Sequence, residues 1–246
     1  MVGIEFQDDI YALAVTNMVL HDDGKSNIHQ GDCFAFVEAI REAYQPNVGL
    51  LNPPYKTRKS DIEELEFVLN NLEMLQQGGV CVAIVPMSSV LAQEGIGLEL
   101  KQKLLARHTL EGVLSMPGEL FHNSKVGVVT AALIVTANVP HSPDKKTWFG
   151  YCRDDGYVKT KTRGRIDVFD KWPSIREHWV KAFRNREVEI GFSLMQKVEA
   201  ADEWCAEAYM ETDYSKILQQ DFETVVRNYA IFTLLEATAV SSEETE

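Results

Sequence analysis

The chain has 246 residues, of which 45% are hydrophobic and 25% charged, a balance typical of a globular protein. No apolar stretch is long enough to span a bilayer, and the first residues lack the basic and apolar segments of a signal peptide, so we expect a cytoplasmic protein without membrane contact. Its four cysteines are widely spaced and form no Cys-x-x-Cys pattern, which argues against a disulfide framework and predicts no metal site.

The net charge of −13 is unevenly distributed along the chain. Residues 145–186 contain 12 Lys and Arg against 5 Asp and Glu, whereas residues 187–246 contain 3 against 14. The basic segment is a candidate surface for nucleic-acid phosphates, and an ordinary solvated surface is the alternative. The acidic segment either aids solubility or faces a basic partner subunit.

Hydrophobic patterning predicts alternating strands and helices in the first part of the chain. The expected strands cover residues 2–6, 27–30, 48–51, 80–85, 110–116 and 126–136, and the expected helices cover 8–21, 34–44, 62–75 and 97–108. We expect Asp8 or Asp9 to cap the first helix and Gly78-Gly79 to end the third. This alternation indicates a parallel, doubly wound α/β sheet, with its last two strands pairing antiparallel at the edge.

The rest of the chain divides by composition. We expect a main α/β core over residues 1–140, a basic, aromatic-rich segment over 141–186, a helical extension over 187–240 and a disordered tail over 241–246. The aromatic residues of the second segment either contact nucleic acid or form a packed satellite core. In the extension, apolar spacing predicts helices from Leu194 to Tyr209 and from Phe222 to Leu235.

The third expected strand ends abruptly in Asn52-Pro53-Pro54-Tyr55, because two prolines cannot donate to a β-ladder. The carboxyl end of a strand in an α/β sheet is where ligands bind, although an ordinary proline-rich turn is the alternative. The tetrapeptide resembles the catalytic motif of amino-methyltransferases that use S-adenosylmethionine. By this resemblance the Asn52 amide oxygen and the Pro53 carbonyl accept hydrogen bonds from a nucleobase amine and stabilise its developing positive charge, while Tyr55 stacks on the extracted base.

Further candidate residues lie at neighbouring strand ends. Glu5 and Asp32 follow the first two strands, where a carboxylate commonly accepts hydrogen bonds from ribose hydroxyls. The alternative for either acid is a helix N-cap, and Asp32 also resembles the residue that contacts the cofactor adenine. Lys56, Arg58 and Lys59 form a basic loop where substrate phosphates would lie, or a solvated loop.

The order of several motifs resembles the modification subunit of type I restriction-modification systems. The resemblance covers about residues 1–186 and rests on Gly-Ile-Glu at 3–5, Gly31-Asp32, Asn-Pro-Pro-Tyr, Val-Ala-Ile-Val-Pro at 82–86 and Leu-Ser-Met-Pro-Gly-Glu-Leu-Phe at 114–121. It implies an adenine-specific DNA methyltransferase with S-adenosylmethionine as cofactor, and double-stranded DNA, a specificity subunit and a restriction subunit as partners. In that family the loop residue matching Phe121 helps to hold the target base, and a core aromatic is the alternative.

One feature departs from the family. Its glycine-rich cofactor loop, and the strand before it, would precede residue 1, so we expect a partial Rossmann-like methyltransferase sheet with its first strand missing. That strand belongs between the strands bearing Glu5 and Asn52. A truncated chain, one piece of a split gene and a remnant all fit, and we predict weak or no cofactor binding by this polypeptide alone. RNA or a protein glutamine as substrate, and an inactive fragment that only assembles with other subunits, are the other interpretations.

Overall fold

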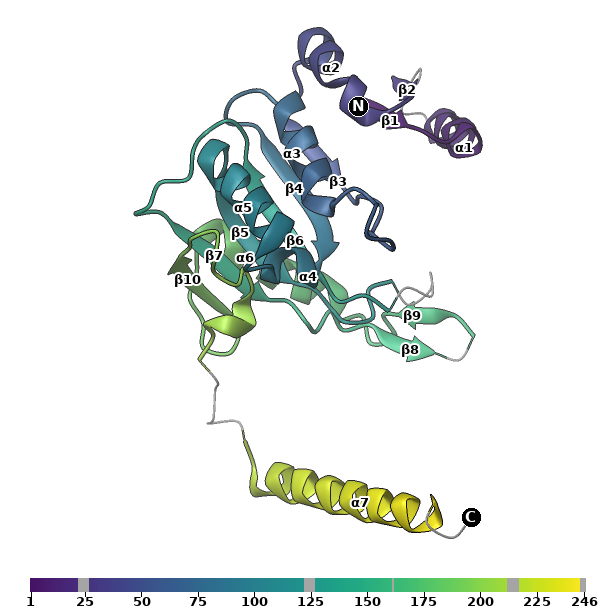
Figure 1. The fold of residues 1–246 in the computed structure, drawn as a ribbon, viewed down its shortest axis with the longest axis vertical. Helices are drawn as coiled ribbons and strands as arrows, with labels where there is room; N and C mark the ends of the chain where they lie inside the picture. The colour runs from purple at the N-terminus through teal and green to yellow at the C-terminus, as the bar shows by residue number, and fades with distance from the viewer. Residues whose placement is uncertain (22–26, 122–126, 161, 212–216, 244–246) are drawn as a thin grey trace. The chain divides into compact units, whose positions relative to one another are not determined.

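The computed structural model describes residues 1–21, 27–121, 127–160, 162–211 and 217–243 (Figure 1). Contacts divide the chain into two units, Met1–Met210 and Glu211–Glu246. The division therefore falls after residue 210, whereas composition had placed a boundary near residue 187. The first unit holds every expected strand and every candidate site residue.

The first unit is built on a mixed sheet of six strands in the order β10-β7-β5-β6-β4-β3. Pairing is parallel between β3 and β4 and between β5 and β7, and antiparallel in the pairs β4–β6, β5–β6 and β7–β10. The strands are β3 (Val48–Leu51), β4 (Val80–Pro86), β5 (Thr109–Ser115), β6 (Thr130–Thr136), β7 (Lys146–Tyr151) and β10 (Ser193–Lys197). This is the expected α/β class, but β5 and β6 pair in the middle of the sheet and not at its edge.

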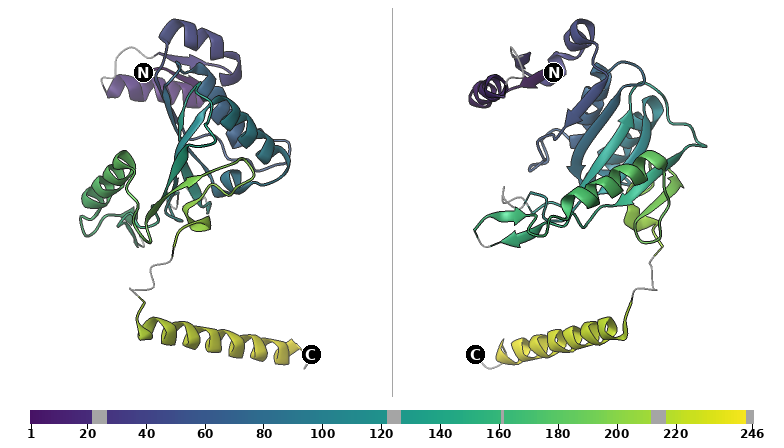
Figure 2. Two further views of the ribbon diagram at one scale, coloured as in Figure 1. Left: turned by 90° about the vertical axis from the view of Figure 1, so that its left-hand side faces the viewer. Right: turned by 180° about the vertical axis from the view of Figure 1, so that it is seen from behind.

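Helices cover both faces of this sheet. Figure 2 shows α3 (Glu64–Met74) and α5 (Gly95–Arg107) on one face, and α6 (Trp172–Asn185) on the other. The short α4 (Met87–Leu91) follows β4 directly. Two layers of helices explain why the central strands are apolar almost throughout, since a sheet buried on both faces has no polar side.

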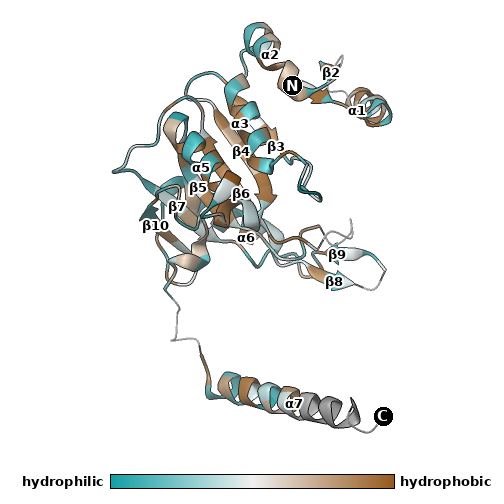
Figure 3. Cartoon of the chain, viewed as in Figure 1, coloured by the Kyte–Doolittle hydropathy of each residue, from teal (hydrophilic) through white to brown (hydrophobic). Residues whose placement is uncertain are grey.

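The core lies between the sheet and these helices. Strands β4 and β6 are among the most hydrophobic parts of the unit (Figure 3). Leu72 of α3, Leu104 of α5 and Leu133 of β6 are fully buried, as are Phe149 of β7 and Trp204. Burial of such side chains stabilises the fold by about 1.5–3 kcal/mol each, relative to exposure.

The N-terminal elements form a separate small sheet. Strands β1 (Gly3–Glu5) and β2 (Ile28–Gln30) pair in parallel, with α1 (Asp8–Leu20) between them in sequence and η1 (Cys33–Ala35) and α2 (Val37–Tyr44) following. Helix α1 has no buried residue. Its N-cap is Gln7, so the expected cap by Asp8 or Asp9 is wrong, and both acids lie in the first turn instead.

A break separates this pair from the main sheet. Among the described residues, β3 pairs only with β4, and β1 pairs only with β2. Residues of β1 and β3 line a common cavity of about 260 Å³, and Leu50 of β3 remains 75% exposed. The strand that the family resemblance places between β1 and β3 is not among the described residues.

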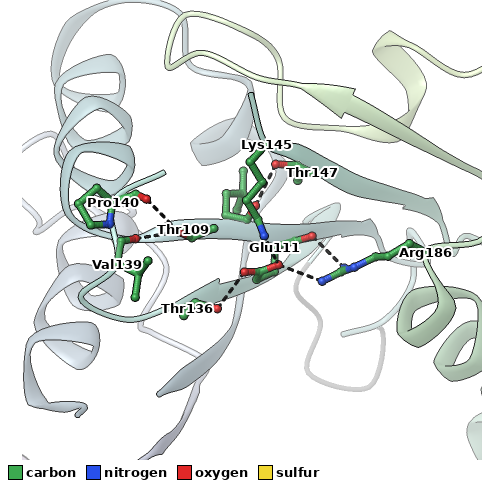
Figure 4. Close-up of polar contacts among 9 residues, drawn as sticks. Thr109, Glu111, Thr136, Val139, Pro140, Lys145, Thr147 and Arg186 are labelled. Carbon is green, nitrogen blue, oxygen red and sulfur yellow. Dashed lines mark hydrogen bonds and ion pairs between the residues drawn. The ribbon is translucent and has the colours of Figure 1, made fainter. Parts of the chain in front are cut away.

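A polar network around Glu111 connects the start of β5 to neighbouring elements. Glu111 is the extra residue at a register shift in the pairing of β5 with β6, as in a β-bulge. Its carboxylate accepts hydrogen bonds from Thr136 (3.0 Å) and Arg186 (2.9 Å) and forms an ion pair with Lys145 (3.0 Å; Figure 4). One acid thus ties β6, the start of β7 and the end of α6 together.

The structure corrects the expected helix over residues 194–209. Residues 193–197 form β10, whose Leu194 pairs with Phe149 of β7, and only the 3-10 turn η3 (Ala206–Ala208) is helical there. The apolar residues of this segment lie in an edge strand and a buried turn and not in a helix. The segment does not need helical hydrogen bonds, because pairing with β7 satisfies the backbone of residues 193–197. The end of the third helix also differs, since α3 stops at Met74 before the glycines.

The tryptophans of the basic segment, residues 141–186, pack inside the protein or against one another. Trp148 is fully buried, and Trp172 stands edge-to-face against Trp179 at 5.4 Å between ring centroids. A small antiparallel pair, β8 (Val158–Thr160) and β9 (Gly164–Ile166), completes it. These rings therefore form a satellite core, one of the two interpretations left open by the sequence.

The second unit consists of α7 (Gln219–Glu243), which contains the helix expected over 222–235. The tail expected over residues 241–246 is helical as far as Glu243, and residues 244–246 lie outside the described residues. In the described part of the chain, no helix is both long and apolar enough to cross a bilayer.

Candidate active site

The Asn-Pro-Pro-Tyr tetrapeptide lies at the carboxyl end of β3, as expected. Asn52 is exposed, Pro53 is buried and Tyr55 is half-buried. The Tyr55 hydroxyl donates a hydrogen bond to Asn52 Oδ1 at 3.1 Å. The phenol therefore holds the carboxamide in one orientation, and the second lone pair of Oδ1 remains able to accept another donor.

The environment of Tyr55 keeps its hydroxyl protonated. Burial, and next the negative charge of Glu64, raise the pKa of Tyr55 to about 12. The phenol is a donor at neutral pH, as an ordinary tyrosine is, and the raised pKa extends this state to alkaline pH. This state is the one that orients Asn52 Oδ1.

Acidic residues fix the loop that follows the tetrapeptide. The Lys56 backbone N–H donates to Glu64 Oε1 at 2.7 Å, and the N–H groups of Thr57 and Arg58 donate to Asp61 Oδ2 at 3.0 and 2.8 Å. These hydrogen bonds, that of Arg58 first, hold the pKa of Asp61 below its ordinary value. The Lys56 ammonium also pairs with Glu63.

Sequence reasoning did not single out Asp61, Glu63 or Glu64. Glu63 is the N-cap of α3 and shares a capping box with Glu66, so acids at this position are well explained by helix initiation alone. Only the folded loop shows that Asp61 and Glu64 accept hydrogen bonds from the backbone of the residues directly after the tetrapeptide. A carboxylate in the first turn of a helix gives no sequence signal that distinguishes the two roles.

Phe121 lies beside Tyr55, with the ring centroids 5.9 Å apart and the rings nearly perpendicular at 83°. The loop after β5 that carries Phe121 is held by Arg153, which donates to the Met116 carbonyl at 3.1 Å and pairs with Glu207. The structure thus brings Phe121 to the tetrapeptide and does not place it in the main core. Residues 122–126 lie outside the described residues.

A cavity of about 510 Å³ opens next to Tyr55. It runs between the loop after β3 and helix α4 at the end of β4, and its lining includes Lys56, Glu64, Pro86 and Ser89. The segments that follow two neighbouring strands therefore enclose a space large enough for a nucleobase beside the candidate catalytic group.

Glu5 and Asp32 lie at the same end of the small sheet, because β1 and β2 are parallel and Glu5 pairs with Gln30. Asp32 caps η1 by accepting from the Phe34 N–H at 3.0 Å, and Glu5 Oε1 accepts from the Gln7 N–H at 2.8 Å. The N-cap alternative therefore applies to Asp32. In the described residues each carboxylate retains one oxygen without a hydrogen bond, which suits an acceptor for ribose hydroxyls or an amine.

Two contacts connect these acids with the rest of the site. The Asn70 side chain of α3 donates to the Cys33 carbonyl at 3.3 Å, and Phe34 packs against Phe67 of α3 at 5.1 Å between centroids. Helix α3 thus contacts the turn after Asp32 and, through Glu64, the loop after Asn52. No described contact joins Glu5 or Asp32 directly to Asn52.

The three basic residues after the tetrapeptide differ in their surroundings. Lys56 is half-buried and paired with Glu63, whereas Arg58 and Lys59 are exposed. All three line the 510 Å³ cavity. Arg58 and Lys59 are therefore the two cations whose charge faces solvent at the mouth of the site.

Comparison with solved structures identifies the fold. The chain aligns with a type I restriction-modification methyltransferase subunit from Streptococcus thermophilus at a TM-score of 0.65 and 21% identity, covering 80% of this chain and 44% of that one. It also aligns with a class I S-adenosylmethionine-dependent methyltransferase from Listeria monocytogenes at a TM-score of 0.54 and 15% identity, covering 75% and 54%. The fold is that of the class I methyltransferases.

Comparison of sequences identifies the family. Residues 1–234 match the N-6 DNA Methylase family. The chain is 35% identical over 239 residues to the type II restriction enzyme and methyltransferase RM.BcgI of Heyndrickxia coagulans, covering 94% of this chain and 37% of the relative. It is 24% identical over 218 residues to the type I StySPI methylase subunit of Salmonella potsdam, covering 82% and 39%. The chain therefore belongs to the N-6 DNA methylase family and spans less than two fifths of the length of these relatives.

Proposed function

We propose that this chain supplies the target-amine half of a DNA adenine methyltransferase, which transfers a methyl group from S-adenosylmethionine to the exocyclic amine of adenine. The observation that carries the proposal is the exposed Asn52 carboxamide at the end of β3, with Oδ1 held by the Tyr55 hydroxyl at 3.1 Å. S-adenosylmethionine supplies an electrophilic methyl group when bound.

The chain's own residues act on the amine. An adenine amine is a poor nucleophile, because its lone pair is delocalised into the ring. Asn52 Oδ1 and the Pro53 carbonyl accept its two N–H groups and stabilise the positive charge that develops on nitrogen. Fixing these acceptors before the base arrives avoids the cost of reorganising them during the reaction.

The aromatic pair beside Asn52 supports a base as the substrate. A half-buried Tyr55, with Phe121 at its edge and a 510 Å³ cavity alongside, offers a stacking surface for a nucleobase taken out of its helix. Arg58 and Lys59 at the mouth of the cavity would contact the phosphates on either side of that base.

Cofactor contacts are assigned to Glu5 and Asp32. Each places a carboxylate at the carboxyl end of a parallel strand pair and keeps an oxygen available. We expect these oxygens to accept from the hydroxyl and amine groups of the adenosine part of the cofactor.

Helix α7 supports a role for partner subunits. Four of its exposed apolar residues recur at intervals of three and four, which is the spacing of a helix-packing seam: Phe222, Val225, Tyr229 and Phe232. Such a seam is unfavourable in water unless another helix covers it. We infer that α7 packs on a helical segment of a specificity or restriction subunit.

Methyl transfer to defined substrates tests the proposal. The chain, alone and within any longer polypeptide that its coding sequence specifies, is incubated with labelled S-adenosylmethionine and duplex DNA, structured RNA or protein. N6-methyladenine in the DNA is expected, and Asn52→Ala should lower its rate by about 10²–10³-fold, as for loss of one preorganised polar group.

The matched control is Asn185→Ala, which removes an exposed amide on α6 and should leave the rate unchanged. Methylation of RNA or protein alone, or equal rates for Asn52→Ala and the control, would contradict the proposal.

A further inference from the structure

Glu64 is a buried acid that the reaction chemistry does not use. Only 5% of its surface is exposed, although it is the first residue of α3 and borders the 510 Å³ cavity. A buried carboxylate is costly unless hydrogen bonds compensate its lost hydration. Its two oxygens therefore need specific partners.

Those partners come from the segments that follow two neighbouring strands, β3 and β4. Oε1 accepts from the Lys56 backbone N–H at 2.7 Å, directly after Tyr55, and Oε2 accepts from the Ser89 hydroxyl at 3.1 Å, in α4 after β4. One carboxylate thus joins the loop after β3 to the helix after β4. These are the two segments that enclose the cavity beside Tyr55.

Resting on the function proposed above, we propose that Glu64 is a positioning residue that locks the Asn52–Tyr55 loop against the end of β4. Bonds to an ionised acceptor are among the stronger hydrogen bonds, so this bridge limits how far Lys56, and with it Tyr55, can move. Tyr55 in turn holds Asn52 Oδ1. Glu64 acts through these residues and touches no reacting atom.

The charge of Glu64 has a second, compatible effect. It contributes to the raised pKa of Tyr55, after the contribution of burial. This contribution extends the pH range over which the phenol donates to Asn52.

Trypsin offers a test that does not depend on activity, because Lys56, Arg58 and Lys59 are cleavage sites within the loop. Glu64→Ala removes both hydrogen bonds and should speed cleavage at these sites by at least about tenfold, the factor expected when even one hydrogen bond to a charged group is lost. Glu64→Gln keeps an oxygen for the Lys56 N–H and an amide N–H for Ser89, so its cleavage should stay within about twofold of the native chain.

The control is Glu73→Ala, which removes an acid of the same helix that pairs with Arg107 at the surface. It should leave cleavage of the loop unchanged. Where methyl transfer is measurable, Glu64→Ala should lower kcat more than it raises KM, and Glu64→Gln should restore most of kcat.

Three results would overturn the inference. They are unchanged loop cleavage in Glu64→Ala, equal damage in Glu64→Gln, and faster cleavage at all tryptic sites together, which would mean global destabilisation. Because proteolysis needs no substrate, failure of this inference is distinguishable from failure of the proposed methyl transfer.

Discussion

At the residue scale, burial shapes the groups of the site. Burial raises the pKa of Tyr55, and the buried Glu64 carboxylate accepts from the Lys56 N–H and the Ser89 hydroxyl. Burial also acts outside the site, at His108 before β5. This histidine is fully buried, and its Nδ1 accepts from the Asn138 backbone N–H at 3.0 Å.

His108 predicts acid sensitivity. Burial, and next the positive charge of Arg107, lower its pKa to about 4, against 6.5 for the ordinary group. The unfolded chain therefore binds a proton that the folded chain does not, and the free energy of unfolding should fall as the pH drops from about 6.5 to 4. The loss attributable to this residue should be about 2 kcal/mol.

Urea unfolding at pH 7 and pH 4.5 checks this value. Tryptophan fluorescence reports on the first unit alone, because all four tryptophans lie before residue 211. His108→Asn keeps an acceptor near the Nδ1 position but cannot be protonated, so its loss of stability should be smaller than that of the native chain. Identical losses in both proteins would rule out this role.

At the element scale, the molecule leaves apolar surfaces that further polypeptide would cover. Strand β3 exposes Val48 and Leu50 at a sheet edge that is unpaired among the described residues. Helix α7 shows a seam of four apolar residues, defined above. The two features differ in kind, since a strand edge offers backbone hydrogen bonds whereas α7 offers side chains only.

The seam of α7 predicts a loss of assembly on mutation. Phe222→Lys with Tyr229→Lys should weaken copurification of the chain with its partner subunit at least tenfold, because aromatic anchors carry much of the binding energy of an interface. Arg227→Ala, between the two and off the seam, is the control. Far-ultraviolet circular dichroism should show equal helix content in both variants, and equal copurification would refute the assignment.

At the scale of the whole molecule, the break between β1 and β3 decides what this polypeptide can bind. Glu5 and Asp32 lie on one side of the break, and Asn52 and Tyr55 lie on the other. In class I methyltransferase folds a cofactor spans several strand ends, so a gap removes part of its binding surface. Both sets of candidate residues are present, but no described strand pairs with β1 and β3 to join the two sheets.

Isothermal titration calorimetry of residues 1–246 with S-adenosylmethionine tests this consequence. We expect weak binding, or none, from the chain alone. Tight binding would show that Glu5 and Asp32 suffice and that the gap is unimportant. Glu5→Gln with Asp32→Asn is the matching variant, and it should abolish any residual heat of binding.

Several elements followed directly from residue patterns. The strand before Asn52-Pro53 and the helix after it were predictable, because proline ends a ladder and apolar residues at helical spacing need a buried face. The position of Asn52 at a strand end followed from the same rule. Phe121, in contrast, lies far from Tyr55 in sequence, and only the family resemblance linked the two before the fold placed them 5.9 Å apart.

Local sequence patterns did not predict the structure where a segment forms hydrogen bonds with a distant part of the chain. Residues 193–197 have apolar spacing suited to a helix, yet pairing with β7 makes them a strand. The sequence alone explains Glu64 as an acid at a helix start. Its bridge between the loop after β3 and helix α4 exists only once β3 and β4 lie side by side. Local sequence thus determined the strand, the turn and the chemical groups of the site, whereas tertiary packing decided which groups meet, because contacts between distant segments depend on the sheet order and not on spacing along the chain.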